Sequence, residues 1–440
     1  MRIAWVTPFS QRSAIGRVSA TATQILGERG HEVRIIRSEL DATDGGAIYP
    51  TKCTVSWWHD LPAHELEQTS DAVVLNIGDN YHFHAGVLAY IDVVPCLGIF
   101  HDFYLYNFFH EWIVVNGLGE DVYKREIRMT YGELGLDIAD RAWRNDTAIA
   151  PHGLADQDIA DVLPMTEWLA GRCGAAIGHS RFYFDRLTES CPGPVAVTPL
   201  CFETADIAPP AGGRGDEVVV TTVGILNPNK CVDAVIKAIA SSPNLKRRCR
   251  YRLVGAISED ERNRLAALCE ETGYSRVDIL GEVNDAALAA ELERADILSC
   301  LRKPVIEGAS ASAIEGMKSG RPIIVPEAGF FLDLPDDLVF KVPRSIEVRA
   351  LAEVLERLVS NETLRRETGA KAREWALNAF SAEGYVNGIE SLIKRFIEAK
   401  PLLALGERLG RQLAALGIAA DDPAIGRLAQ AMDDLFGTTR

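Results

Sequence analysis

Two glutamates separated by seven residues give the strongest chemical signal in the sequence. Between Glu307 and Glu315 lie only small residues and one isoleucine, and the apolar stretch 297–301 predicts a buried strand just before them. A helix is expected to begin near Ser310, which leaves Glu307 in the loop and places Glu315 about five residues into the helix. Small residues such as Ala311 would let a ligand approach the free N–H groups of the first turn, which favour an anion. Each carboxylate can accept hydrogen bonds from the hydroxyls of a sugar or a ribose. The same spacing also fits two surface acids at a helix start, where carboxylates are favoured.

A second site for an anion is predicted between Gly224 and Lys230. Gly224 ends the strand predicted at 217–223, Asn227 turns the chain, and a helix is expected to begin at about Asn229. Lys230 then falls in the first helical turn, where a cation opposes the helix dipole by about a few tenths of a kcal/mol. A bound diphosphate would reverse this effect, because the lysine and the helix N-terminus would attract it together. The alternative is an exposed lysine that tolerates a small penalty.

Short apolar runs alternate with helix-like segments, which predicts two parallel sheets covered on both faces. The predicted strands are 2–7, 32–37, 72–77, 94–100, 175–178 and 195–198, then 217–223, 251–254, 277–280, 297–301 and 322–325. The predicted helices are 18–29, 85–91, 230–241, 259–272, 285–294, 310–319 and 346–376, and the region 105–170 is expected to be mostly helical. The Gly/Pro-rich segment 208–215 is the clearest linker. Two such sheets joined by a hinge place a cleft between their carboxyl edges, where ligands bind.

Polar side chains follow the third and fourth predicted strands. Asp79, Asn80 and His84 come after the third strand, and His101 and Asp102 come after the fourth. These positions predict an acceptor pocket at the cleft. His84 and the histidine two residues before it have no evident third ligand, so no metal site is predicted.

Taken together, the motifs of the second half resemble the retaining glycosyltransferases of group 1 (family 4), which have the GT-B fold. The two glutamates followed by Ser319-Gly-Arg-Pro322 and the turn from Gly224 to Lys230 carry the resemblance, which covers 215–395 well and 1–205 in outline. It implies an α/β protein with two Rossmann-like, doubly wound domains facing a central cleft and extra C-terminal helices. The expected parts are an acceptor-side domain at 1–207, a nucleotide-sugar-binding domain at 208–380, a helix crossing back at 381–400 and a helical extension at 401–440.

The resemblance also implies roles for individual residues. Glu307 is expected to position the sugar, Glu315 the ribose, and backbone near Val283 the base. His101 matches a histidine that the family places near the transferred sugar. The expected catalytic residues are His101, Lys230 and Glu307, and the expected donor-binding residues are Gly16, Gly224, Asn227, Lys230, Val283, Arg302, Ser310, Ala311 and Glu315.

Three positions depart from the family pattern. Ile15 stands where the loop after the first strand has a second glycine, Ile225 stands where many members have a diphosphate-binding arginine, and Cys231 replaces a glycine. We expect Arg302 or Lys303 to supply the missing charge.

The activity implied is transfer of a sugar from a UDP- or GDP-sugar to an acceptor hydroxyl, with retention of anomeric configuration and without a metal. The departing phosphate oxygen is expected to take the acceptor proton, so no side-chain base is required. Three rivals remain open: a sugar-nucleotide epimerase, a phosphorylase and a non-catalytic partner subunit. Nicotinamide chemistry is disfavoured, because the first predicted strand is not followed by G-x-G-x-x-G.

The composition limits the partners. Of 440 residues, 47% are hydrophobic and 25% charged, and the formal net charge is −16. This balance argues against nucleic acid as a partner and against tight binding to anionic lipid. Nine cysteines without a C-x2-C pair indicate a reducing compartment, and no apolar stretch approaches the ~18 residues of a membrane helix. We expect a cytoplasmic protein, or one peripheral to the inner membrane. The implied setting is bacterial surface polysaccharide or glycolipid synthesis, with a glycan or glycolipid acceptor.

The last forty residues carry two apolar stripes at helical spacing. One consists of Leu402, Leu405, Leu409, Leu413 and Leu416, and the other of Ile425, Leu428, Met432 and Leu435. Such stripes predict either packing on the protein's own domains or a homodimer contact.

Overall fold

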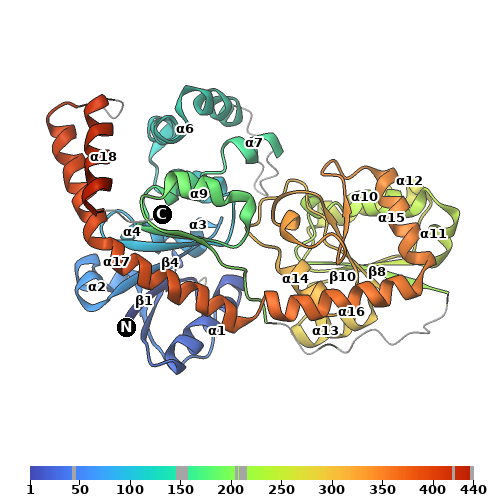
Figure 1. The fold of residues 1–440 in the computed structure, drawn as a ribbon. Helices are drawn as coiled ribbons and strands as arrows, with labels where there is room; N and C mark the ends of the chain where they lie inside the picture. The colour runs from blue at the N-terminus through green and yellow to red at the C-terminus, as the bar shows by residue number, and fades with distance from the viewer. Residues whose placement is uncertain (42–45, 145–156, 204–206, 208–215, 419–421, 437–440) are drawn as a thin grey trace.

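The computed structural model describes residues 1–41, 46–144, 157–203, 207, 216–418 and 422–436. Two α/β domains lie side by side, and the chain crosses between them twice (Figure 1). The linker predicted at 208–215 lies outside the described residues. Both sheets are parallel in every strand pairing of the described residues, so the predicted fold class of two Rossmann-like domains is confirmed.

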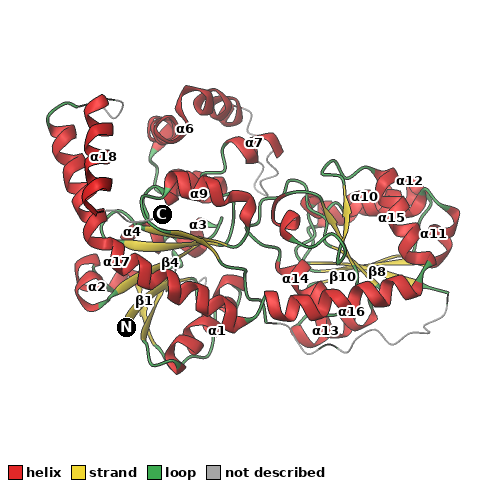
Figure 2. Ribbon diagram, viewed as in Figure 1, coloured by secondary structure: helices red, strands yellow, loops and turns green. Residues whose placement is uncertain are grey.

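The first domain has a seven-stranded sheet in the order β3-β2-β1-β4-β5-β6-β7. Its strands are β1 (Arg2–Thr7), β2 (Glu32–Arg37), β3 (Thr54–Trp57), β4 (Ala72–Ile77), β5 (Cys96–Phe100), β6 (Ala175–Gly178) and β7 (Val195–Val197). Its helices are α1 (Ala14–Glu28), α2 (Ala63–Thr69), α3 (Tyr81–His84), α4 (Gly86–Tyr90), α5 (Tyr106–Val115), α6 (Gly119–Arg144), α7 (Gln157–Val162), α8 (Thr166–Ala170) and α9 (Phe184–Ser190), with short 3-10 turns at Trp58–Asp60 and Arg181–Tyr183. Strand β4 is buried along its whole length, as expected for a central strand covered by helices on both faces (Figure 2).

The second domain has a six-stranded sheet in the order β10-β9-β8-β11-β12-β13. Its strands are β8 (Val218–Val223), β9 (Cys249–Val254), β10 (Val277–Gly281), β11 (Ile297–Ser299), β12 (Ile323–Pro326) and β13 (Phe340–Val342). Its helices are α10 (Val232–Ala240), α11 (Pro243–Arg248), α12 (Glu259–Thr272), α13 (Asp285–Arg294), α14 (Ala311–Lys318), α15 (Val348–Ser360) and α16 (Glu362–Ala379), with 3-10 turns at Pro228–Lys230 and Gly329–Asp333.

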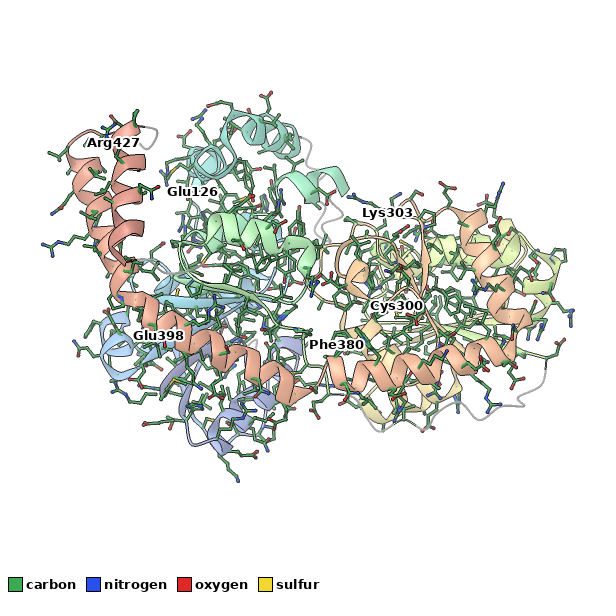
Figure 3. All side chains as sticks on the ribbon, in the orientation of Figure 1. Glu126, Cys300, Lys303, Phe380, Glu398 and Arg427 are labelled. Atoms are coloured by element: carbon green, nitrogen blue, oxygen red, sulfur yellow. The ribbon has the colours of Figure 1, made fainter. Side chains whose placement is uncertain are left out.

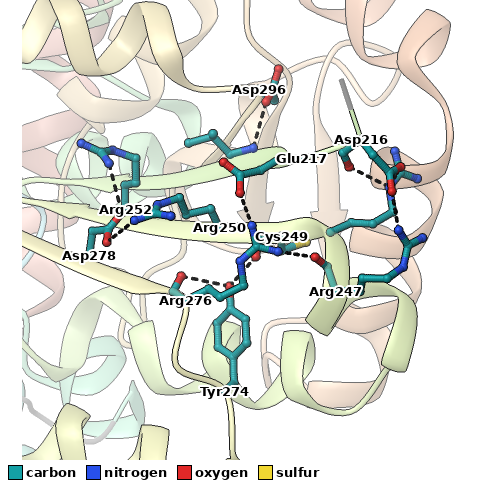
Figure 4. Close-up of polar contacts among 12 residues, drawn as sticks. Asp216, Glu217, Arg247, Cys249, Arg250, Arg252, Tyr274, Arg276, Asp278 and Asp296 are labelled. Atoms are coloured by element: carbon teal, nitrogen blue, oxygen red, sulfur yellow. Dashed lines mark hydrogen bonds and ion pairs between the residues drawn. The ribbon is translucent and has the colours of Figure 1, made fainter. Parts of the chain in front are cut away.

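The amino ends of the second sheet's strands are joined by ion pairs, which leaves the carboxyl ends for a ligand. Arg250 on β9 donates to Asp278 on β10 over 2.6 and 2.9 Å, and Arg276 pairs with Glu217 ahead of β8 (Figure 4). The side chain of Asp296 accepts the N–H of Val219, which fixes the start of β11 against β8 (Figure 4).

Several predicted boundaries move. The helix expected at 346–376 is interrupted at Asn361, whose side chain accepts the N–H of Leu364 and so caps a new helix, α16. The short strands β3 and β13, at one edge of each sheet, were not predicted. The helix expected at Asn229 begins only at Val232, because residues 228–230 form a 3-10 turn.

Two helices close the chain. Helix α17 (Ala382–Ala415) continues past the boundary predicted at 400 with Pro401 inside it and bends sharply along its course, and α18 (Pro423–Phe436) turns back along its end (Figure 1). The first part of α17 is buried against the first domain through residues such as Ile389 and Phe396. Farther along, Leu405 and Leu416 are exposed, so these positions of the first apolar stripe are left uncovered by the described chain. No helix in the described ranges is long and apolar enough to cross a bilayer.

Lys318, at the end of α14, fastens both crossings between the domains. Its ammonium donates to the carbonyl of Phe202 on the first crossing over 3.0 Å and to that of Phe380 on the second over 2.9 Å (Figure 3 labels Phe380 between the two domains). Only 9% of Lys318 is exposed. One buried cation of the second domain therefore bonds both crossings.

We expect Lys318→Met to lower the melting temperature, because it keeps the apolar stem but leaves two carbonyl oxygens without their donor. The loss should be about 1–3 kcal/mol of unfolding free energy, the range for a buried polar group left unpaired. Calorimetry measures it. Lys371→Met, at an exposed position of α16, is the matched control and should change little. Equal melting temperatures for both variants would contradict the role given to Lys318.

Candidate active site

A cavity of about 610 Å³ lies between the carboxyl edges of the two sheets and is lined by both domains. It contains many of the residues singled out from the sequence. Those that line it are Asp79, Asn80, His84, His101, Asp102, Gly224, Lys230, Arg302, Glu307, Ala311 and Glu315. The candidates that do not line it are Gly16, Asn227, Val283 and Ser310.

Gly16 is a packing glycine in this structure. Its N–H is bound by the side chain of Ser13, which caps α1, and a Cβ added there would lie 2.9 Å from the carbonyl of Pro8. Ala14 and Ile15 line the cavity instead. Gly16 therefore does not present its backbone to the cavity. Other residues of the first turn of α1 lie there, and the N–H groups of this turn have no acceptor within the helix.

The loop after β1 is held by an acid that was missed in the sequence. Glu39, which is buried, accepts the N–H groups of Phe9 over 2.9 Å and Ser10 over 3.0 Å, and it pairs with Arg37 over 3.2 Å. Because this carboxylate accepts both N–H groups, they are not available to bind a phosphate in the loop.

The loop that carries Glu307 is bonded directly to the first domain. Asp102 and Glu307 form an antiparallel bridge, the N–H of Gly308 donates to the carbonyl of His101 over 3.0 Å, and the carbonyl of Ile306 accepts the N–H groups of Phe103 and of the next residue, each over 3.0 Å. A Cβ on Gly308 would lie 2.7 Å from the carbonyl oxygen of His101, so the contact requires glycine. The two domains are thus in direct main-chain contact beside Glu307.

Arg302 is tied into this loop. It donates to Glu307 over 3.1 Å and to the hydroxyl of Ser312 over 2.8 Å. Burial raises the pKa of Glu307, but the charges of Arg302 and Lys230 outweigh burial and hold the pKa below its ordinary value. The second carboxylate oxygen of Glu307 has no partner among the described residues. Lys303, the alternative to Arg302, points elsewhere and donates to the carbonyl of Ser345 (Figure 3).

Lys230 lies at the floor of the cavity. Burial, with a smaller contribution from Arg302, lowers the pKa of its ammonium to about 7. Gly224 has a φ of 108°, and a Cβ there would lie 3.0 Å from the nitrogen of Lys230. Cys231, at the position where the family has glycine, adopts the left-handed φ of 52° and separates the 3-10 turn from α10. Lys230 therefore precedes the helix. The prediction that it lies in the first helical turn is wrong.

Glu315 faces the cavity from the middle of α14. Burial raises the pKa of its carboxyl to about 7, and the charge of Arg17 opposes this shift. Arg17 extends from α1 and pairs with Asp285 at the start of α13 over 3.0 Å, which joins the domains at this side of the cavity. Nothing in the sequence of α1 indicates that Arg17 has a partner 268 residues away.

His101 belongs to a buried chain of polar groups. Its Nε2 lies 3.0 Å from Oδ1 of Asn76, and its Nδ1 lies 3.2 Å from Nε2 of His179. The other ring nitrogen of His179 lies 2.9 Å from the carbonyl of Thr198. Both ring nitrogens of His101 are therefore occupied by protein groups. His179 follows β6 directly, a position that could have identified it as a residue of the same sheet edge.

The acceptor-side residues also stabilise local structure. Asp79 accepts the N–H of Phe108 over 3.1 Å at the start of α5, and Asn80 caps α3. Burial, followed by the charge of Asp102, raises the pKa of Asp79 well above its ordinary value. Asp102 accepts the N–H of Asp79 over 2.9 Å, and burial together with Glu307 raises the pKa of Asp102 to about 7.

All nine cysteines are free thiols, and within the described residues no three His, Cys, Asp or Glu side chains come together as metal ligands do.

Residues 205–375 match the family model described as glycosyl transferases group 1. The curated proteins compared with the chain include no match. Among solved structures, sucrose-phosphate synthase from Thermosynechococcus elongatus has a TM-score of 0.61 at 16% identity, with 91% of this chain and 100% of that chain covered. HepE from Anabaena in complex with UDP and glucose has a TM-score of 0.58 at 14% identity, with 90% and 99% covered.

WaaG, a glycosyltransferase involved in lipopolysaccharide biosynthesis, has a TM-score of 0.52 at 16% identity, with 89% of this chain and 99% of that chain covered. At such identities these structures share the fold, and the family model matches the domain that contributes Lys230, Glu307 and Glu315. The predicted resemblance to group 1 is confirmed for the second domain, which matches that family model, and both domains have the GT-B fold.

Proposed function

We propose that the protein transfers a sugar, with retention of anomeric configuration, from a UDP- or GDP-sugar to an acceptor hydroxyl. The observation that carries this proposal is the cavity between the two domains. It brings two cations, Lys230 and Arg302, and two glutamates of the second domain beside His101 of the first.

The donor diphosphate would lie near Lys230 and the first turn of α14. The N–H groups of Ala311 and Ser312 lie in that turn and have no acceptor within the helix, so they favour an anion. A bound phosphate would raise the pKa of Lys230 from about 7 and hold the lysine charged. Ile225, which is 67% exposed, stands where many family members have a phosphate-binding arginine. Arg302 lines the same cavity. We propose that Arg302 supplies that charge.

The two glutamates would hold the hydroxyls of the donor. Arg302 keeps Glu307 ionised, and the unpartnered oxygen of Glu307 is available to accept from a sugar hydroxyl. Glu315, on the helix that follows, would accept from the ribose. Gly224 and backbone near Val283 are proposed to contact the nucleotide, and Asp79, Asn80, His84 and Asp102 to form the acceptor side.

The mechanism we propose is largely electrostatic and uses no metal. Lys230, Arg302 and the first turns of α1 and α14 stabilise the charge that develops on the leaving diphosphate while the sugar takes on oxocarbenium character. The departing phosphate oxygen takes the proton of the acceptor hydroxyl. The contacts between residues 101–104 and 306–308 exclude water, which would otherwise hydrolyse the donor.

A glycan or glycolipid acceptor of bacterial surface polysaccharide synthesis is the setting we propose, with the protein in the cytoplasm or peripheral to the inner membrane. The similarity in fold to WaaG supports this setting, and the UDP complex of HepE supports a uridine donor.

UDP or GDP should raise the melting temperature of the protein, because each supplies the diphosphate that the cavity binds.

Arg302→Ala should weaken nucleotide binding at least tenfold, about 1.4 kcal/mol, as measured by calorimetry. Lys303→Ala, its neighbour in sequence, is the matched control and should bind as the wild type does. If both variants bind the nucleotide with equal affinity, the proposed role of Arg302 in phosphate binding is wrong.

Incubation with a panel of UDP- and GDP-sugars should give slow hydrolysis of one donor, with the anomeric configuration of the released sugar retained, as followed by NMR. Lys230→Ala should abolish this hydrolysis, because the leaving diphosphate loses a cation. An epimerised donor would favour the epimerase, and absence of binding would favour a non-catalytic partner subunit.

Glu315→Gln should make the protein more stable at pH 8 and less able to bind the donor. The pKa of Glu315 lies above its unfolded value, so its contribution is complete below pH 4.5 and is lost as the pH rises through about 7. Glutamine avoids this loss, which is roughly 3 kcal/mol at most. The gain in melting temperature should therefore appear at pH 8 and vanish near pH 5. Glu282→Gln, at an exposed position, should show neither effect.

A further inference from the structure

The buried chain through His101 and His179 ends in an acceptor on both sides. The carbonyl oxygen of Thr198 lies at one end, 2.9 Å from Nδ1 of His179. The side-chain oxygen of Asn76 lies at the other end, 3.0 Å from Nε2 of His101. Asn76 cannot turn its amide around without loss, because its Nδ2 donates to the carbonyl of Val6 over 3.1 Å. Both ends therefore require a hydrogen atom from the histidines.

The contact between the two histidine rings lacks a hydrogen atom when both rings are neutral. Two neutral imidazoles carry two N–H groups, and the outer acceptors use both: Nδ1–H of His179 and Nε2–H of His101. The inner nitrogens, Nδ1 of His101 and Nε2 of His179, then face each other over 3.2 Å with a lone pair each. A third proton between them would turn this repulsion into a hydrogen bond. The pair is thus a binding site for one proton.

Titratable groups of neighbouring elements lie beside the pair. The hydroxyl of Tyr183, before α9, accepts the N–H of His179 over 2.7 Å, and the ring of Tyr385 on α17 lies 5.8 Å from the ring of His179. His84 on α3, Asp102 after β5, and Lys230, Arg302 and Glu307 of the second domain line the same cavity as His101. Burial lowers the pKa of His101 well below its ordinary value and that of His179 to about 4. In the free protein, burial therefore opposes the third proton that the geometry favours.

We propose that the His101–His179 pair takes up one proton from solvent when a nucleotide-sugar binds, and that His179 is the positioning residue that holds it. This inference rests on the proposed function, because the charge of the donor phosphates in the same cavity supplies the attraction that offsets burial. The proton returns to solvent when the nucleotide leaves. His101 then presents a fixed positive ring to the cavity, and neither ring nitrogen is free to act as a base.

Histidine-selective 15N labelling of the full chain, with UDP as the probe, tests the inference directly. Without UDP near pH 7, both histidines should be neutral, His179 as the Nδ1–H tautomer and His101 as the Nε2–H tautomer. With UDP, one additional nitrogen of the pair should become protonated, while His84 stays neutral. If UDP binds and both inner nitrogens keep their lone pairs, the inference fails and the proposed function stands. If neither UDP nor GDP binds, both fail.

His179→Gln provides the functional readout, because glutamine cannot carry the shared proton. The slope of log Kd for UDP against pH should fall by about one proton relative to the wild type. His64→Gln, exposed on α2, is the control and should keep the wild-type slope. An unchanged slope in His179→Gln would overturn the inference. Should that variant not fold, the 15N measurement on the wild-type chain decides by itself: a pair that stays neutral with UDP bound overturns the inference.

Discussion

The active cavity of this protein exists because a short stretch of backbone joins the two domains. Residues 306–308 of the second domain bond to residues 101–104 of the first through main-chain groups, and Gly308 has no side chain to prevent the approach. Glu307 lies within this stretch, so the residue proposed to hold the sugar is positioned by the same bonds that close the domains. The position of Glu307 in the cavity therefore depends on the contact between the two domains.

The cavity places several ionisable groups where their charged forms are costly. The pKa values of Lys230, Asp102 and Glu315 are all brought to about 7, in each case mainly by burial. Such values lie close to physiological pH, where a small change in the surroundings alters the charge of each group. A ligand that carries negative phosphates and many hydroxyls would compensate the lysine and bond the carboxylates. Burial therefore brings one cation and two carboxyl groups of the same cavity close to the pH at which each changes its charge.

Much of the architecture could be predicted from the sequence, because long buried strands and capped helices leave clear patterns. The strands before His101 and Lys230 placed both residues at the correct sheet edges. The local path at Lys230 could not be predicted, since it depends on a left-handed cysteine that ends a 3-10 turn. The pairing of His101 with His179 joins residues 78 positions apart, and the closure of Arg17 onto Asp285 joins residues 268 apart. Contacts of this kind follow from the tertiary fold and have no local signature.

Helix α14 connects the cavity to the two crossings between the domains. Its first turn and Glu315 face the cavity, while Lys318 at its end bonds both crossings of the chain. The helix is eight residues long, a rigid body of roughly 12 Å. The residues that line the cavity and the lysine that bonds both crossings therefore lie on one short rigid element, so a shift of this helix would move the cavity wall and the crossings together.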